Sequence, residues 1–190
     1  MMPFDQFPRA GIQDAATRRK LFRSTKSYGH AEGLSCVFRQ WRAGHSHCRL
    51  LHGYALAFRF VFAAEELDER NWCFDFGGLK PVKAWLHEMF DHTLVVAADD
   101  PELEAFRQLA ERGIVALRVL PAVGCEAIAR IVFKHVAQFV AEAAGQRVWL
   151  EQVEVSEHSG NAASYSENRP GPPLAPGPAR TDAFPCESRP

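Results

Sequence analysis

The chain has 190 residues, of which 47% are hydrophobic and 24% charged, and 22 basic against 23 acidic side chains give a net charge of −1. This length suffices for one domain with a full hydrophobic core. The balanced charge gives no reason to expect nucleic acid or a membrane surface as a partner. No apolar run is long enough to span a bilayer, and the first residues lack the order of a signal peptide, so a cytoplasmic location is expected.

The two ends differ in composition from the middle of the chain. Residues 166–190 are rich in proline, glycine and serine, which predicts a disordered tail. Residues 1–18 show no sustained period and predict a flexible N-terminal segment. One folded domain is therefore expected over residues 19–165.

The first half of this domain has the patterns of strands. Residues 20–28 predict a first strand, and residues 54–63 alternate aromatic and aliphatic side chains as a second strand does. A long loop separates them. After a polar, turn-like cluster, residues 72–76 predict a short third strand that pairs with the second as a hairpin.

The second half is mainly helical by pattern. Apolar residues at three- and four-residue steps predict helices over 79–90, 101–112 and 125–143. Residues 114–120 are either a strand or an extended connection. Residues 148–157 predict a last strand, so the whole order favours an α+β protein with helices on one face of an antiparallel sheet.

The loop before the second strand carries the most chemical side chains. Cys48 lies four positions before His52, and His45 and His47 are close by in sequence. A thiol near imidazoles suits proton transfer, because its pKa falls next to a cation or a metal. The chain has five cysteines, an odd number that argues against a disulfide framework. Cys125, at a helix start, is expected to be a small buried hydrophobe.

Four motifs in order resemble one enzyme family. They are Cys48 to Gly53, the run Asp75 to Lys80, the pair Asp91-His92, and a late strand ending in Glu157. Together they resemble the 6-pyruvoyltetrahydropterin synthase and 6-carboxytetrahydropterin synthase family. The resemblance covers about residues 20 to 165 and is more specific than any single motif.

The resemblance implies a T-fold, in which an antiparallel four-stranded sheet has helices packed on one face. Copies of such a chain join edge to edge into an oligomeric barrel, so a homo-oligomer with sites between subunits is expected. The implied activity is that of a 6-carboxy-5,6,7,8-tetrahydropterin synthase-like lyase. It converts 7,8-dihydroneopterin triphosphate to 6-carboxytetrahydropterin and releases acetaldehyde and triphosphate, a step toward 7-deazaguanine compounds such as queuosine. A 6-pyruvoyltetrahydropterin synthase, or a catalytically altered pterin- or purine-binding paralogue, are the alternatives.

The resemblance also implies roles for single residues. Cys48 would transfer a proton, Asp91 and His92 would assist it, and Glu157 would hold the pterin ring. A carboxylate suits that last role because its two oxygens can accept the paired N–H donors of a pterin. Glu126 falls where the family often has a glutamate, although helix capping explains it almost as well. Without the family frame, Asp91-His92 would be an ordinary helix end.

Zinc is the implied cofactor, yet the sequence departs from the family's three histidines. His52 fits the second ligand, but Tyr54 stands where the third is expected. His30 can be matched to the first ligand, and an alternative register through Phe38 leaves no histidine there. The sequence therefore leaves open whether zinc is held, with a loop histidine such as His45 or His47 as a replacement ligand. Arg42 and Arg49 flank the site and are candidates for contacting the triphosphate.

Overall fold

A computed structural model describes residues 20–168. The flexible segment predicted for residues 1–18 and most of the tail predicted for residues 166–190 lie outside the described residues. Within them, strand β7 runs to Ser166, one residue beyond the domain end expected from the sequence. Between residues 20 and 168, no helix is long and apolar enough to cross a membrane.

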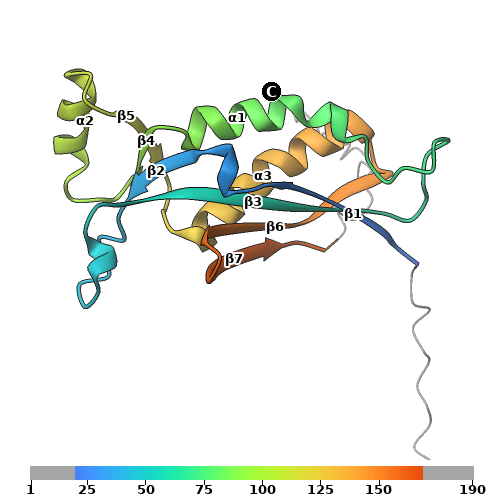
Figure 1. The fold of residues 1–190 in the computed structure, drawn as a ribbon, viewed down its shortest axis with the longest axis horizontal. Coiled ribbons are helices and arrows are strands. Elements are labelled where there is room, and N and C mark those ends of the chain that lie inside the picture. The colour runs from blue at the N-terminus through green and yellow to red at the C-terminus, as the bar shows by residue number, and fades with distance from the viewer. Residues whose placement is uncertain (1–19, 169–190) are drawn as a thin grey trace, which may run out of the picture.

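Four antiparallel strands form the larger part of the sheet. They are β1 (Phe22–Tyr28), β3 (His52–Ala64), β6 (Val148–His158) and β7 (Asn161–Ser166), side by side in the order β1-β3-β6-β7. Figure 1 shows β3 as the long central strand. The strands predicted at 20–28, 54–63 and 148–157 are confirmed. The fourth strand is β7, which the sequence analysis did not predict.

Three shorter strands extend this sheet. β2 (Leu34–Phe38) pairs antiparallel with the first part of β3, on the edge that β1 covers farther along. β4 (Thr93–Ala97) pairs parallel with β2, and β5 (Ala116–Leu120) pairs parallel with β4. The whole sheet is therefore seven-stranded and mixed. β2 and β4 were not predicted, whereas residues 114–120 prove to contain a strand.

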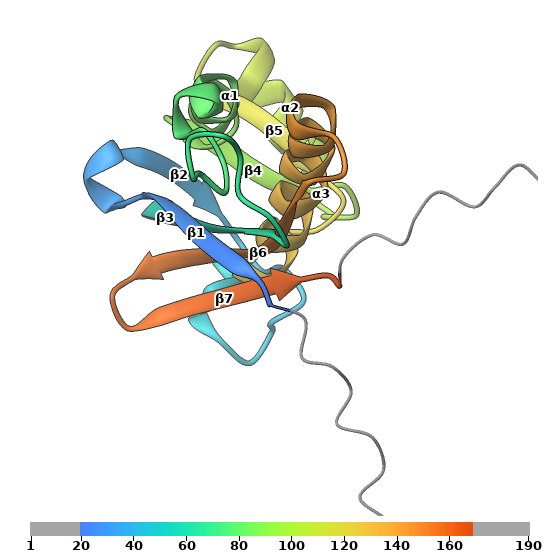
Figure 2. The ribbon, with the colours of Figure 1, turned by 90° about the vertical axis from the view of Figure 1, so that its right-hand side faces the viewer.

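The two longest helices lie on one face of the sheet, as expected. Figure 2 shows α1 (Lys80–Phe90) and α3 (Cys125–Ala144) on the same side of the strands. The third helix, α2 (Leu103–Glu111), covers the other face of the parallel strands, where Phe106 lies in one buried cluster with Leu94 and Val96 of β4. Pro81 falls in the first turn of α1, where its missing N–H costs nothing. All three predicted helices are confirmed to within a few residues.

The predicted third strand over residues 72–76 is wrong. These residues form a turn that leads into a short 3-10 helix, Phe76–Leu79. A half-buried strand buries alternate side chains, but Cys73 and Phe74 are neighbours and both are buried. Phe74 stacks on Phe62 with ring centres 4.9 Å apart. The apolar run therefore anchors a loop to the core.

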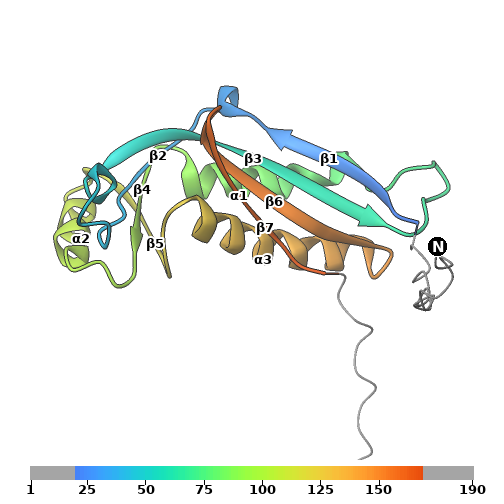
Figure 3. The ribbon, with the colours of Figure 1, turned by 90° about the horizontal axis from the view of Figure 1, so that it is seen from below.

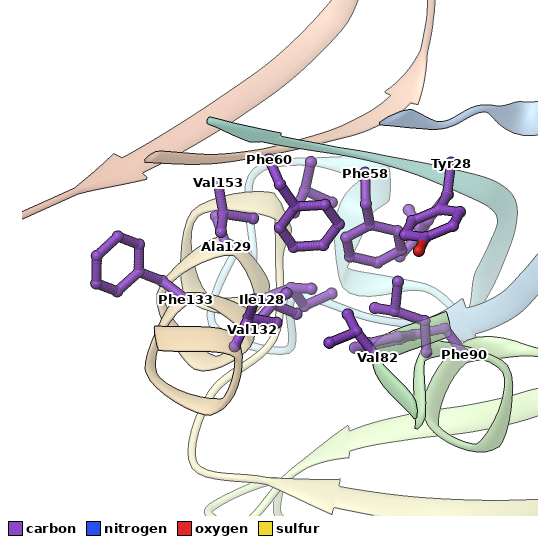
Figure 4. Packing of buried hydrophobic residues seen from close by; sticks show 14 of the residues in the cluster. Tyr28, Phe58, Phe60, Val82, Phe90, Ile128, Ala129, Val132, Phe133 and Val153 are labelled. Atoms are coloured by element: carbon purple, nitrogen blue, oxygen red, sulfur yellow. The ribbon is translucent and has the colours of Figure 1, made fainter. Parts of the chain in front are cut away.

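The helix-facing side of β3 forms the centre of the core. Figure 4 shows Phe58 and Phe60 pointing from the sheet toward Phe90 of α1 and Ile128 of α3. All four side chains are at most 1% exposed, and burying each contributes about 1.5–3 kcal/mol. Because strand side chains alternate, His52 and Tyr54 at the start of β3 lie on this same face. The core thus determines where the side chains of the opening motif point.

Candidate functional site

Three rings meet where β2 ends and β3 begins. The antiparallel register places Cys36 opposite Tyr54 and Phe38 opposite His52, so all four side chains share the helix-facing side. Ring centres lie 5.3 Å apart for Phe38 and His52, 5.4 Å for His52 and Tyr54, and 6.2 Å for Phe38 and Tyr54. We call these three residues the aromatic cluster.

Glu157 reaches the same place from the end of β6. The register of β6 against β7 shifts between Ser156 and His158, which makes Glu157 the extra residue of a β-bulge. Bulges re-aim side chains and are common beside active sites. Burial, and then the charge of Glu157, raise the pKa of Tyr54, with smaller contributions from the thiols of Cys48 and Cys125. The predicted residues Cys48 and Glu157 therefore both lie near enough to Tyr54 to influence its pKa.

The thiols around this site differ in exposure. Cys48 is exposed on the 3-10 turn His47–Arg49, whereas Cys36 and Cys125 are buried. Burial raises the pKa of Cys36 to about 12. Burial, together with the nearby carboxylates of Glu157 and Glu126, raises the pKa of Cys125 to about 12. Cys48 is thus the exposed thiol among the three, and its predicted position on a loop is confirmed. The place of Cys125 beside Glu157 was not predicted, because only its burial could be read from the sequence.

The loop that carries Cys48 is fixed against the start of α3. The backbone N–H of Gln40 donates to the carbonyl of Cys48 at 2.7 Å. The Gln40 side chain packs on Gly124, the residue before α3, so closely that a Cβ there would lie 2.3 Å from Nε2. Gly124 also has a φ of 106°, which favours glycine. Loop and helix start therefore hold each other in place.

Two ion pairs fix the other side of this loop. Arg39 donates from Nε and Nη2 to both carboxylate oxygens of Asp100, at 2.9 and 2.5 Å. Arg42 binds Asp99 at 2.5 Å and lies over the ring of Trp41. The guanidinium of Arg42 is therefore already paired with a carboxylate, so Arg42 is a less suitable ligand for a triphosphate than an unpaired arginine would be.

Asp91 and His92 follow α1 directly. His92 has a φ of 55°, an unusual value for a residue other than glycine, and its ring nitrogen Nδ1 lies 2.6 Å from Asp91 Oδ1. The second oxygen of Asp91 lies 3.2 Å from Nδ1 of His87. The hydrogen bonds from His92 and then His87 lower the pKa of Asp91. Because Asp91 is ionised, Nδ1 of His92 must carry the proton, which leaves Nε2 free.

Within residues 20–168, no hydrogen bond or ion pair joins the Asp91-His92 pair to Cys48 or Glu157. Thr93, the next residue, pairs with Cys36 on β2, and Cys36 pairs with Tyr54 on β3. The pair thus begins two strands away from Tyr54, a distance of about 10 Å at the usual strand spacing. The His92 side chain is 88% exposed, so its free nitrogen is available to another molecule.

The residues present do not fit the zinc ion that the resemblance implies. In the strand register Phe38 faces His52, whereas His30 lies before β2 with its Nδ1 2.6 Å from the carbonyl oxygen of Ala55. Residues 20–168 contain no group of three His, Cys, Asp or Glu side chains that could hold a metal ion. His45 and His47 remain exposed on the loop. Of the three places in the aromatic cluster, only His52 offers a usual zinc ligand.

A cavity of about 690 Å³ lies at the other end of the sheet, lined by Arg23, Trp149 and Glu151 among others. Figure 3 shows this end, where β1 and β6 begin, far from the loop between β2 and β3. None of the predicted site residues lines this cavity. Its position therefore gives no support to a role in the chemistry of Cys48.

Solved structures share the fold. An uncharacterized protein from Wolinella succinogenes aligns with a TM-score of 0.66 at 17% identity, over 78% of this chain and 99% of its own. The 6-pyruvoyl tetrahydropterin synthase from Plasmodium vivax aligns with a TM-score of 0.59 at 14% identity, over the same shares. The expected T-fold is confirmed.

Sequence relatives point the same way. A protein of Rickettsia felis named 6-carboxy-5,6,7,8-tetrahydropterin synthase is 39% identical over 78 residues, and its Rickettsia conorii counterpart is 33% identical over 78 residues. Both matches cover 37% of this chain, and the chain spans 56% of the length of each relative. The profile of the family described as 6-pyruvoyl tetrahydropterin synthase matches residues 18–168. The chain therefore belongs to the 6-pyruvoyl tetrahydropterin synthase family.

Proposed function

We propose that this protein is a lyase of the 6-carboxy-5,6,7,8-tetrahydropterin synthase type. Its substrates would be 7,8-dihydroneopterin triphosphate and one water molecule, and its products 6-carboxytetrahydropterin, acetaldehyde and triphosphate. The observation that carries the proposal is that an exposed thiol, Cys48, and a bulge carboxylate, Glu157, both lie within electrostatic range of Tyr54. The names of the Rickettsia relatives support the same reaction.

Glu157 and Cys48 divide the work of the site. The two oxygens of Glu157 accept hydrogen bonds from adjacent N–H groups on the pterin ring, which fixes the ring's orientation. The side chain of the pterin then extends toward the loop, where the sulfur of Cys48 takes a proton from a side-chain carbon and later returns one. Gln40 packs on Gly124 and its backbone N–H bonds the carbonyl of Cys48, so the loop that carries the thiol is fixed relative to the start of α3.

Asp91 and His92 form a proton-exchanging pair. The ionised Asp91 accepts the hydrogen bond from Nδ1 of His92 and fixes the tautomer, so Nε2 can accept or donate a proton. Since the pair is exposed and set apart from Cys48 in its own chain, we propose that it serves the Cys48 of a neighbouring subunit in a homo-oligomer. A cytoplasmic location and the lack of nucleic-acid or membrane partners stay predictions.

A second function is favoured by one observation. The aromatic cluster holds Phe38 and Tyr54 where the family resemblance calls for imidazoles. A chain that binds a pterin through Glu157 but does not convert it would also have this arrangement. Binding without turnover would identify such a paralogue.

Replacing the thiol tests the lyase proposal. Cys48→Ala is expected to abolish acetaldehyde release while neopterin still binds, because Glu157 remains. The matched control is Cys73→Ala, which removes a buried thiol at the other end of β3, near Phe62. Its turnover, measured at a temperature where it stays folded, should equal that of the wild type. Unchanged turnover in Cys48→Ala would remove Cys48 from the mechanism.

A further inference from the structure

We infer that the candidate site works without a zinc ion, because Phe38 and Tyr54 of the aromatic cluster occupy two of the three ligand positions of a metal site. The inference rests on the proposed function only for the identity of the substrate. Its evidence is the placement of three rings and the hydrogen bond of one of them.

The spacing of the rings is that of a metal site. Three imidazoles around one zinc ion, each with a Zn–N bond of about 2.0–2.1 Å and tetrahedral angles, have ring centres about 5 Å apart. The ring centres of Phe38, His52 and Tyr54 are separated by 5.3, 5.4 and 6.2 Å. The backbone thus presents three side chains at nearly the distances that a bound zinc requires.

His52 is also oriented as a metal ligand would be. Its Nδ1 lies 2.7 Å from the carbonyl oxygen of Leu50, and a carbonyl can only accept, so Nδ1 carries the proton. The lone pair is then on Nε2. A backbone carbonyl that fixes the tautomer in this way is the usual outer partner of a metal-binding histidine.

The other two positions cannot complete the site. The Phe38 ring has no lone pair to donate, and it is 1% exposed, so no other side chain takes its place. Tyr54 offers a neutral phenol, which is not among the usual zinc ligands. The neighbouring ring of His158 accepts a hydrogen bond from the Gly160 N–H at Nδ1, so its Nε2 bears the proton. Of the three side chains in the aromatic cluster, only His52 therefore offers a nitrogen lone pair to a metal ion.

Restoring the missing imidazoles gives a direct test. Zinc would be measured by elemental analysis and by competition with a zinc-sensitive dye on the full chain, purified from zinc-supplemented medium. The wild type is expected to carry far less than one zinc ion per chain. The double variant Phe38→His, Tyr54→His is expected to hold about one zinc ion per chain, since three imidazoles suffice. This readout does not depend on turnover.

The control introduces two histidines at positions that are not next to His52. Phe22→His, Ile114→His changes two exposed apolar side chains, one on β1 and one in the turn before β5, and should bind no more zinc than the wild type. If the change at the buried Phe38 prevents folding, the single variant Tyr54→His still pairs two imidazoles and should bind zinc more tightly than the wild type.

Two results would overturn the inference. One is stoichiometric zinc in the wild type that His52→Ala removes. The other is a folded double variant that binds no more zinc than the control. A wild type without zinc and without turnover would instead contradict only the proposed lyase function.

Discussion

The three titratable side chains near Tyr54 differ in burial, and this difference suits them to different roles. Glu157 is the bulge residue at the end of β6, Cys125 is buried with a pKa raised to about 12, and Cys48 is exposed. A buried neutral thiol cannot act as a base at neutral pH. The proposed chemistry therefore depends on Cys48 for proton transfer and on Glu157 for binding.

Glu157→Gln tests the binding role. The amide keeps the shape of the side chain but replaces one acceptor oxygen by a donor, so one hydrogen bond to the pterin is lost and a donor faces a donor. We expect neopterin to bind about tenfold to a hundredfold more weakly, as for a lost hydrogen bond to a charged group. Fluorescence titration measures this.

The control for this change is Glu154→Gln on the same strand. Glu154 pairs with Arg59 in the register of β6 and β3, and its neighbours Val153 and Val155 point to the buried face. Equal losses in both variants would contradict a specific role for Glu157.

The same residues show how far single positions could be predicted. Cys48 and Glu157 could be singled out because Cys48 begins a Cys-x-x-x-His-Gly motif and Glu157 ends an alternating strand. The residue facing His52 was not decided, since His30 and Phe38 both fit the spacing in sequence. Only the pairing of β2 with β3 shows that Phe38 takes this place, and strand register depends on contacts between distant residues.

At the scale of elements, β2 and β4 are the two strands of the parallel part of the sheet and its link to β3 that could not be predicted from the sequence. β2 alternates buried and exposed residues over only five positions inside a long loop. β4 buries all five of its side chains, so it lacks alternation and looks like a continuation of α1. The helices were predictable because their apolar period extends over three turns or more. The short strands depend on the rest of the sheet.

The ion pair of Arg39 and Asp100 connects two of these elements, the end of β2 and the start of α2. The Asp100 side chain is 1% exposed, and Arg39 lowers its pKa. Asp100→Asn leaves the half-buried Arg39 guanidinium without its counter-charge, so we expect a loss of about 2 kcal/mol in the free energy of unfolding at pH 7, as for a lost hydrogen bond to a charged group. Urea unfolding measures this loss.

This loss should depend on pH. A carboxyl whose pKa is lowered in the folded state stabilises the fold above its ordinary pKa of about 4, and the effect disappears as the pH falls through the lowered value. The difference in the free energy of unfolding between wild type and Asp100→Asn should therefore be constant from neutral pH down to about 5 and shrink below about 4. A gap that stays constant into that acid range would contradict the role of the ion pair.

At the scale of the whole molecule, the proposed catalytic groups fall into two sets. Cys48 and Glu157 both influence the pKa of Tyr54, whereas the exposed pair Asp91-His92 begins two strands away. β1 and β7 form the two edges of the antiparallel sheet, and open edges can pair with another copy. We therefore expect a homo-oligomer in which one chain supplies Cys48 and another supplies His92.

Mixing impaired variants tests this division. Co-refolded Cys48→Ala and His92→Ala chains should recover about a quarter of the wild-type activity, because a quarter of the sites then combine two intact residues. Cys48→Ala mixed with Glu157→Gln should show no activity beyond that of the two variants measured separately, since both residues belong to one chain's site. Recovery in the second mixture, or none in the first, would contradict the arrangement.

The most direct test of the whole account is product analysis with 7,8-dihydroneopterin triphosphate. Chelator-treated wild-type protein is predicted to release one acetaldehyde and one triphosphate for each 6-carboxytetrahydropterin formed, and Cys48→Ala is predicted to release neither. A folded wild-type protein that binds the pterin but releases no acetaldehyde, with or without added zinc, would contradict the lyase assignment.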